Sequence, residues 1–362
     1  MSEYFKRLGI DIIGELAFGF SFNTQVHDKY RHVYELNETL AWRLNTYMQF
    51  PAIRPIELFL LLVGAKQATK FIDTIKYVLT NRISKKKDAY HDLYSMIIDN
   101  LVQEEGRDVV TTELMTEAVA FLTAGGLSIA TALSAVFFYL SRCPKSYDKL
   151  AVEIRSSFSS AEEIHGGPKL ASCRYLRACI DESLRMSSPA QSHSWREFDD
   201  KESGPFIVDG HVIPPGVQVA INPYAMLHND EYFTDPFVFH PERWLDSNAG
   251  SDSEETDAKS IEEARVAMRQ AFNPFSLGDR SCVGKSMAYL EISLVLAQTL
   301  WLFDFETAQG REGDLGGGTT GRKDRNRHDE FQLGDILVTR HQGPNLIFKK
   351  RGDHWKDIRP GE

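Results

Sequence analysis

The sequence predicts a mainly α-helical protein with small β-sheets. Three observations lead to this fold class. Apolar residues recur at the three- and four-residue spacing of a helix in most long segments, for example at 1–22 and 285–305. Residues 118–140 carry no charged side chain, although charged amphipathic segments flank them on both sides. Two short apolar runs at 206–213 surround an Asp-Gly pair, which is a strong β-hairpin signal.

The length of 362 residues allows two domains or one large one, and we expect a single soluble domain over residues 1–362. Hydrophobic residues make up 42% of the chain and charged residues 25%, a balance typical of a protein that forms a core. The net charge of −10 argues against a nucleic-acid partner. The four cysteines show neither a C-x-x-C pair nor the spacing of metal ligands. We therefore expect no disulfide framework and a reducing compartment.

The first helix is expected within residues 1–22, where the apolar spacing is helical and Gly19 marks the end. Residues 28–80 read as helices that Pro51 and Pro55 interrupt. Similar patterns predict further helices at 90–100, 145–158 and 176–186.

A long central helix is expected to start at Thr111 in the style of a capping box and to end near Leu140. Residues 118–140 are long enough to cross a bilayer. They are also rich in small residues that suit close packing inside a protein, so we predict a buried helix. Gly125 and Gly126 each cost about 1 kcal/mol in a helix interior, which indicates a need for room. Simple helix packing is the alternative explanation.

Strands and loops are expected to follow. A β-rich part begins at 193–196, continues through the hairpin and includes residues 217–221. Residues 222–244 read as an irregular loop because they are dense in Pro, Asp and aromatic side chains.

Two segments are expected to be flexible surface inserts. Residues 246–257 are acidic and rich in Ser, and residues 310–329 are charged and rich in Gly. The chain then closes with two strands within 331–350, separated by Gly343-Pro344.

One loop carries the most specific pattern in the chain. The spacing F-x-x-G-x-R-x-C-x-G is formed by Phe275, Gly278, Arg280, Cys282 and Gly284. Cys282 stands just before the last long helix, where free N–H groups and the helix dipole favour a thiolate. Glycines allow the backbone to fold tightly around the sulfur. A buried structural cysteine before a core helix is the alternative interpretation.

This stretch resembles the haem-binding signature of the cytochrome P450 family, the haem-thiolate monooxygenases. The resemblance implies that Cys282 is the axial ligand of haem iron and that Arg280 pairs with a haem propionate. It also implies that Phe275 packs near the cysteine side of the haem. Gly278 and Gly284 would let backbone amides approach the sulfur.

Two further motifs agree with the resemblance. Glu182 and Arg185 stand three residues apart on one predicted helical face and match the E-x-x-R motif, with Arg243 as the expected third member. An exposed pair would be worth under about 1 kcal/mol, whereas the resemblance implies a buried network for folding and haem retention. His193 and Arg196 are candidates for a haem propionate, with a surface His and an edge Arg as the alternative.

The central helix resembles the family helix that crosses the oxygen-binding side of the haem. Ala124 and Gly125 match the pair that lets oxygen and substrate approach the backbone. Where the family places an acid and a threonine for proton delivery, this chain has Leu127 and Ser128. Ser128 can donate a hydrogen bond, but Leu127 cannot relay a proton. Three alternatives stay open: water and Ser128 suffice, coupling is poor, or the chemistry is not standard monooxygenation.

The resemblance begins with a segment that lies well inside fungal family members. We therefore expect the fold to lack the family's N-terminal portion, which includes a membrane anchor. The family implies the surface of the endoplasmic reticulum membrane as the location, and a cytoplasmic location is expected if the chain is complete.

Three functional hypotheses follow. The first is a monooxygenase of fungal secondary metabolism that oxidises a hydrophobic small molecule, with haem as cofactor and electrons from NADPH-cytochrome P450 reductase. The second is a truncated, inactive or non-enzymatic fragment. The third is an isomerase or peroxide-rearranging enzyme of the same family, which needs no proton relay.

Overall fold

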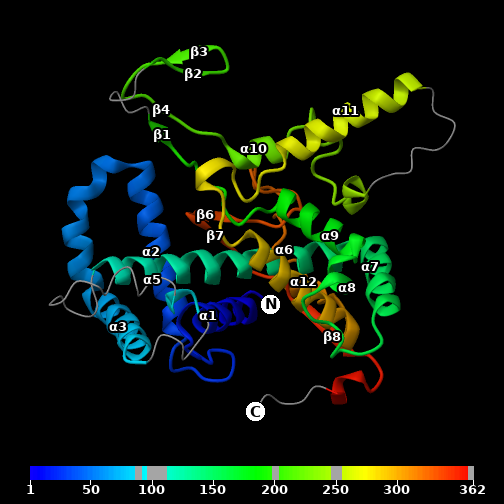
Figure 1. Ribbon diagram of the computed structural model, residues 1–362, viewed down its shortest axis with the longest axis horizontal. Helices are drawn as coiled ribbons and strands as arrows, with labels where there is room; N and C mark the ends of the chain where they lie inside the picture. Colours follow the sequence, from blue (N-terminus) through cyan, green and yellow to red (C-terminus); the bar gives the residue numbers. More distant parts are fainter. Residues whose placement is uncertain (86–91, 96–111, 198–203, 246–254, 358–362) are drawn as a thin grey trace.

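A long apolar helix runs through the middle of the molecule and other helices pack around it (Figure 1). It comprises α5 (Thr112–Phe121), the π-helical turn η3 (Leu122–Leu127) and α6 (Ser128–Arg142). This computed structural model describes residues 1–85, 92–95, 112–197, 204–245 and 255–357. The expected cap at Thr111 and most of the helix expected at 90–100 lie outside the described residues.

The central helix is enclosed by protein, as the sequence predicts. All residues from Ile129 to Leu140 are buried. Among the described residues, Thr112–Arg142 is the one helix whose length and composition would allow it to cross a membrane, and 67% of its most apolar window is buried. Its small side chains let the neighbouring helices approach closely.

The N-terminal helices lie on one side of the central helix (Figure 1). These helices are α1 (Ser2–Phe18), α2 (His32–Gln49), η1 (Pro51–Ile56) and α3 (Glu57–Ile83). Gly19 ends α1 with a left-handed φ of 54°, which confirms the predicted stop. A helix break around Pro51 and Pro55 is also confirmed, because η1 separates α2 from α3.

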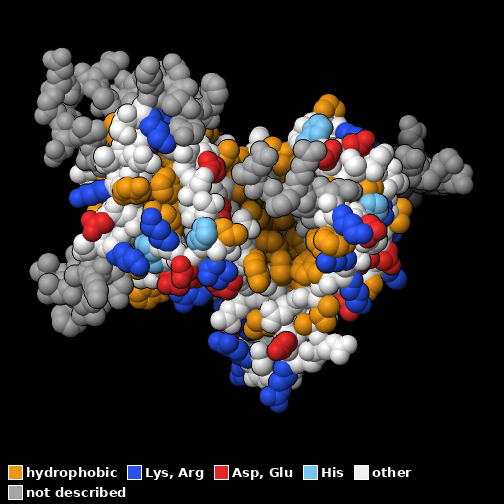
Figure 2. Space-filling view, turned by 90° about the horizontal axis from the view of Figure 1, so that it is seen from below, with side chains coloured by type: hydrophobic (Ala, Val, Ile, Leu, Met, Phe, Trp, Pro, Cys, Tyr) orange, Lys and Arg blue, Asp and Glu red, His pale blue; other side chains and the backbone are white. Residues whose placement is uncertain are grey.

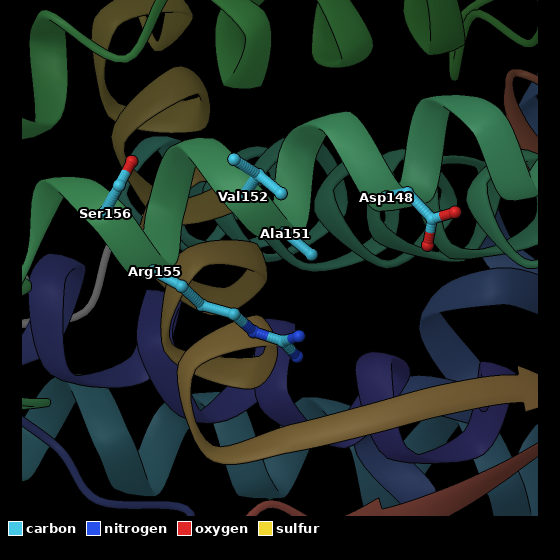
Figure 3. A pocket seen from close by; sticks show the side chains of 5 residues that line it. All are labelled: Asp148, Ala151, Val152, Arg155 and Ser156. Carbon is cyan, nitrogen blue, oxygen red and sulfur yellow. The ribbon is translucent and has the colours of Figure 1, made fainter.

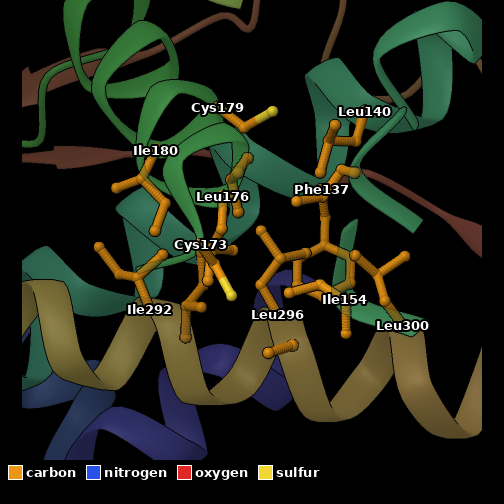
Figure 4. Close-up of a cluster of buried hydrophobic side chains, with 14 of the residues drawn as sticks. Phe137, Leu140, Ile154, Cys173, Leu176, Cys179, Ile180, Ile292, Leu296 and Leu300 are labelled. Atoms are coloured by element: carbon orange, nitrogen blue, oxygen red, sulfur yellow. The ribbon is translucent and has the colours of Figure 1, made fainter. Parts of the chain in front are cut away.

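The other side is formed by α7 (Pro144–Ser157), α8 (Pro168–Ala171), α9 (Arg174–Met186) and α12 (Lys285–Leu302). Their apolar faces meet α6 in one core cluster. Figure 4 shows side chains of three of these helices in the cluster, among them Phe137 of α6, Leu176 of α9 and Leu296 of α12. The helix predicted at 285–305 stops at Leu302, because Phe303 is the first residue of a strand.

The sheets are small antiparallel pairs, as predicted. They pair β1 (Arg196–Glu197) with β4 (Gln218–Val219), β2 (Phe206–Val208) with β3 (His211–Ile213), β5 (Phe303–Thr307) with β8 (Leu346–Lys350), and β6 (Gly334–Ile336) with β7 (Val338–Arg340). The Asp-Gly hairpin is confirmed, because Asp209 and Gly210 both have positive φ, of 48° and 75°.

The end of the chain differs from the prediction of two strands within 331–350. Three strands form there, and β8 pairs with β5, which lies about forty residues earlier. The register places Phe305 opposite Phe348, and their rings lie 5.8 Å apart. The contact between these two rings favours a strand at 303–307 over continuation of the helix.

Residues 310–329, which were expected to be a flexible insert, make backbone contacts in this structure, and their flexibility stays a prediction. The Gly318 N–H donates to the Arg327 carbonyl at 2.9 Å, and the Arg142 guanidinium donates to the Gly313 carbonyl. A Cβ on Gly316, whose φ is 99°, would stand 2.9 Å from the Gln342 carbonyl oxygen. Glycine at this position therefore allows the two backbones to pack closely.

The other expected insert, 246–257, is in part a helix. Residues 246–254 lie outside the described residues, whereas Glu255–Ala271 forms α11, which the sequence analysis missed. Its signal was present, because apolar residues recur at Ile261, Ala264, Met268 and Ala271. The expected irregular loop at 222–244 contains two short helices, α10 (Pro223–Leu227) and η4 (Pro241–Trp244).

The predicted charge network lies at the junction of α9 and η4, with a fully buried Glu182–Arg185 pair at its centre. Glu182 Oε1 accepts hydrogen bonds from Arg185 Nη2 at 2.9 Å and from Arg243 Nε at 3.0 Å. Trp244 Nε1, which was not predicted as a member, donates to Glu182 Oε2 at 2.9 Å. Arg185 and Glu182 are both 0% exposed, so this is the buried network and not an exposed pair.

Burial alone would raise the pKa of Glu182, but Arg185 and Arg243 lower it below its ordinary value of 4.5. A lowered folded-state pKa means that the carboxylate contributes its stability in full above the unfolded value. That contribution is lost as the pH falls below 4.5 and through the lower folded pKa.

We expect Glu182→Gln to lower the free energy of unfolding by about 3–5 kcal/mol, because two buried guanidinium groups lose their counter-charge. Urea unfolding followed by circular dichroism measures this change. Glu163→Gln is the matched control, since the Glu163–Lys169 pair is exposed and screened by solvent, so its loss should change stability much less. Equal losses in the two variants would contradict the buried network.

Candidate active site around Cys282

The Cys282 loop is a tight turn that ends at the first residue of α12. The Cys282 N–H donates to the Phe275 carbonyl at 2.9 Å, which closes the loop. Gly278 begins the short turn η5 (Gly278–Arg280) with a φ of 70°, a backbone conformation that favours glycine. A Cβ on Gly284 would stand 3.9 Å from Cys282 Sγ, an ordinary contact.

Cys282 is exposed, so the alternative of a buried structural cysteine does not hold in this structure. The same loop exposes two apolar side chains, Leu277 at 68% and Val283, the residue after Cys282, at 100%. Exposed apolar side chains next to a thiol at a helix start suit a flat hydrophobic group that also needs a soft ligand. Arg280 is exposed and forms no ion pair within the described part of the chain. The residues present therefore fit a haem held by its iron and by a propionate.

Phe275 backs the loop from the protein side. It is half-buried, packs against the core cluster of α6, α9 and α12, and lies 5.2 Å from the ring of Tyr289. The Lys285 ammonium lies 5.8 Å from the Phe275 ring. Phe275 thus supports the backbone of the Cys282 loop, and its expected place near the cysteine side of a haem stays a prediction.

The predicted oxygen-side residues lie on the π-helical turn of the central helix. Ser128 donates its hydroxyl hydrogen bond back to the Ala124 carbonyl, one turn earlier. Ala124 is exposed and Ser128 is half-buried, so this edge of the helix is open. Such π turns often mark functional positions in long helices.

The two glycines of this turn face α1. A Cβ on Gly125 would stand 2.6 Å from Ile13 Cδ1, and one on Gly126 would stand 2.8 Å from Ile10 Cδ1. The room that these glycines provide is therefore used by α1, which supports the packing explanation. The expected role of Gly125 in oxygen approach stays a prediction.

The Cys282 loop and the π turn belong to one region of the molecule. Met287, on the first turns of α12, packs against the core cluster that contains Leu122 and Leu127 of the π turn. α12 also contacts α6 directly. Figure 2 shows a face that is hollowed near its centre, with hydrophobic side chains gathered in the hollow.

His193 and Arg196 are not joined to the Cys282 loop by any contact within the described residues. His193 stacks on Trp195 with ring centroids 5.5 Å apart. The exposed Arg196 donates to the carbonyls of Ser194 and Trp195. Trp195, which the sequence analysis missed, also donates its indole N–H to Gln49 of α2 at 3.0 Å.

Glu291 of α12 is a second residue that sequence reasoning missed. Burial raises the pKa of its carboxyl to about 7. Its Oε1 atom is buried and has no hydrogen-bond partner among the described residues. A lone Glu in an apolar helix carries no sequence signal of such burial.

A surface hollow of about 480 Å³ lies on α7 and is lined by Asp148, Ala151, Val152, Arg155 and Ser156 (Figure 3). None of the predicted site residues lines it. The Arg155 side chain extends from α7 toward β5 and forms an ion pair with Asp304. The hollow therefore lies beside a structural contact between α7 and β5.

Comparison with known proteins gives a consistent result. A family model described as Cytochrome P450 matches residues 1–315. The chain is 34% identical over 360 residues to "Cytochrome P450 monooxygenase lcsN" of Purpureocillium lilacinum, an alignment that covers 97% of this chain and 99% of that protein.

Other relatives are longer than this chain. The identity is 33% to a "Cytochrome P450 monooxygenase" of Gibberella zeae, of which 78% is covered. It is 37% to "Cytochrome P450 monooxygenase poxM" of Penicillium oxalicum, of which 62% is covered. Each alignment covers 97% of this chain.

We expect Gly9→Ala to lower the free energy of unfolding by about 1–3 kcal/mol, although Ala favours a helix interior by about 1 kcal/mol. The added Cβ would stand 2.4 Å from the Gly126 carbonyl oxygen, and a helix backbone cannot rotate aside. Urea unfolding measures the change. In the control Gly166→Ala, the Cβ meets a rotatable Leu290 methyl at 3.2 Å, so we expect a change within about 0.5 kcal/mol. A stabilised Gly9→Ala variant would contradict the α1 packing.

Proposed function

Because the chain belongs to the cytochrome P450 family, we propose that it is a haem-thiolate monooxygenase that oxidises a hydrophobic small molecule in fungal secondary metabolism. The observation that carries this proposal is the exposed Cys282 thiol at the start of α12, flanked by exposed Leu277 and Val283. The cofactor of this family is haem. Haem bound there supplies the oxidation, in which O₂, two electrons and two protons convert R–H to R–OH and water.

The residues of the loop bind and orient this group. Cys282 Sγ would bind the iron. The hydrogen bond from the Cys282 N–H to the Phe275 carbonyl closes the loop that carries this sulfur. Gly278 supports this course through its positive φ. Arg280 binds a propionate, and His193 and Arg196 are further candidates for that role. The fixed charge of Arg280 suits a carboxylate because a guanidinium stays protonated.

The Ser128 hydroxyl is the proposed proton donor at the open edge of the central helix, which faces away from α1. Its hydrogen bond to the Ala124 carbonyl holds the hydroxyl at the π turn. Leu127 is 2% exposed within a core cluster, so it places no proton donor beside Ser128. Water that reaches Ser128 then has to supply the protons.

The electron donor is proposed to be NADPH-cytochrome P450 reductase, and the location the surface of the endoplasmic reticulum membrane. Both proposals rest on the family. The chain spans 99% of one relative but only 78% and 62% of two others. The activity of those longer relatives is therefore a proposal for this chain.

A second candidate is an isomerase or peroxide-rearranging enzyme of the same family. The apolar Leu127 beside Ser128 favours it, because rearrangement of a preoxidised substrate needs no proton relay. NADPH dependence separates the two candidates, since only the monooxygenase consumes reducing equivalents.

We expect reduced, CO-treated protein made with ample haem to show the Soret band of thiolate ligation, and Cys282→Ala to abolish that band. Cys143→Ala is the control, since Cys143 is half-buried at the start of α7 and should leave the spectrum unchanged. A folded wild-type protein without the band would favour a non-enzymatic fragment.

We expect Ser128→Ala to lower the yield of product per NADPH consumed by roughly tenfold or more, because proton delivery loses its hydroxyl. The assay uses any compound whose binding shifts the Soret band. Ser128→Thr should keep the yield. Ser141→Ala is the control, since Ser141 also bonds back to its own helix, at the Phe138 carbonyl. Product formed without NADPH, at an unchanged rate in Ser128→Ala, would favour the rearranging enzyme.

A further inference from the structure

A buried carboxylate beside the Glu182 network links α9 to the Cys282 loop. Asp181 is 8% exposed. Its Oδ1 accepts the Tyr289 hydroxyl hydrogen bond at 2.6 Å, and its Oδ2 accepts Arg177 Nε at 2.9 Å. The Arg177 guanidinium also lies 3.6 Å over the Tyr289 ring. Asp181 and Arg177 thus hold Tyr289 by its hydroxyl and by its ring face.

Tyr289 in turn supports the loop. Its ring is packed on Phe275, with centroids 5.2 Å apart. The Phe275 carbonyl accepts the N–H of Cys282 at 2.9 Å. A continuous series of contacts therefore runs from Asp181 through Tyr289 and Phe275 to Cys282.

Burial and the groups around Asp181 act on its pKa in opposite directions. Burial raises the pKa of Asp181, and Arg177, Tyr289 and Lys285 act in the opposite direction. Burial also raises the pKa of Tyr289 above its ordinary value. The geometry of this contact is a Tyr289 hydroxyl that donates to Asp181 Oδ1, while Arg177 donates to Oδ2 of the same carboxyl group.

We propose that Asp181 and Tyr289 are positioning residues for Cys282, which fix the loop so that the sulfur keeps one orientation toward iron. This inference rests on the proposed function, in which Cys282 binds haem. It deepens that function by assigning the support of the ligand to the hydrogen bond between Tyr289 and Asp181, which reaches Cys282 through Phe275.

A purely structural role is the alternative, because the same bond joins α9 to α12. The two roles differ in what is lost first. A positioning role predicts that thiolate ligation fails while the fold persists. A structural role predicts that ligation and fold are lost together.

The test uses haem-loaded full chain in increasing urea. Reduced, CO-treated samples report the fraction of haem that retains the thiolate Soret band, and circular dichroism reports the fold. Tyr289→Phe removes the hydroxyl but keeps the ring against Phe275. We expect the ratio of thiolate-bound to thiolate-free haem to fall by roughly threefold to tenfold at urea concentrations below the unfolding transition.

Tyr147→Phe is the matched control. Tyr147 of α7 also donates its hydroxyl to a carboxylate, Asp304 Oδ1 at 3.2 Å, and packs on a Phe ring, Phe305 at 5.0 Å. It contacts β5 instead of the Cys282 loop. We expect Tyr147→Phe to change the unfolding midpoint as Tyr289→Phe does and to leave the thiolate ratio as in wild type.

Asp181→Asn is the second variant and keeps the test open if Tyr289→Phe does not fold. Its amide oxygen still accepts the Tyr289 bond without the charge, so we expect a smaller fall in the thiolate ratio than in Tyr289→Phe. Equal ratios in wild type, Tyr289→Phe and Asp181→Asn would overturn the inference, as would parallel loss of the thiolate band and the fold. A wild-type protein without any thiolate band would instead overturn the proposed function, and this inference with it.

Discussion

The close packing of α1 against the π turn of the central helix is the constraint on which the rest of the structure depends. Gly9 and Gly126 bring the two backbones together, and neither position has room for a side chain. Because α1 closes this side, Ile10 and Ile13 occupy the space beside the glycines. The opposite edge, with Ala124 and Ser128, is left open. The packing of α1 therefore covers the glycine edge of the helix and leaves the edge with Ala124 and Ser128 accessible.

Two adjacent carboxylates on α9 show how the number of donors decides the state of a buried acid. Glu182 receives hydrogen bonds from two guanidinium groups, an indole and a backbone N–H, and its pKa is lowered despite complete burial. Asp181 has one guanidinium and one phenol, and burial raises its pKa. Glu182 thus joins α9 to η4, while Asp181 accepts a hydrogen bond from Tyr289 of α12. The helix α9 is therefore bonded both to η4, through Glu182, and to α12, through Asp181.

The sequence predicted those parts of the fold that depend on local patterns. The central helix, the Asp209-Gly210 hairpin, the Gly19 stop and the Glu182 network are all found, because periodicity, turn chemistry and a paired charge act over a few residues. Pairing of β5 with β8 was missed, because a contact across forty residues leaves no local signal. The backbone contacts of residues 310–329 were likewise not predicted from the sequence. Glycine composition shows that the backbone is free of side chains, but not whether another backbone fills the space.

The candidate site, too, was predicted from the sequence only in part. The motif around Cys282 gave the ligand candidate and its loop, whereas the direction of Gly125 and the support by Tyr289 needed coordinates. Leu127 shows why this matters for chemistry. Its side chain is 2% exposed in a cluster of apolar residues, so an acid at this position would have to be buried. Burial of an unpaired carboxylate costs several kcal/mol and favours the neutral form. The apolar residue is therefore part of the core around the π turn, whereas the Ser128 hydroxyl lies at the open edge and donates to the Ala124 carbonyl.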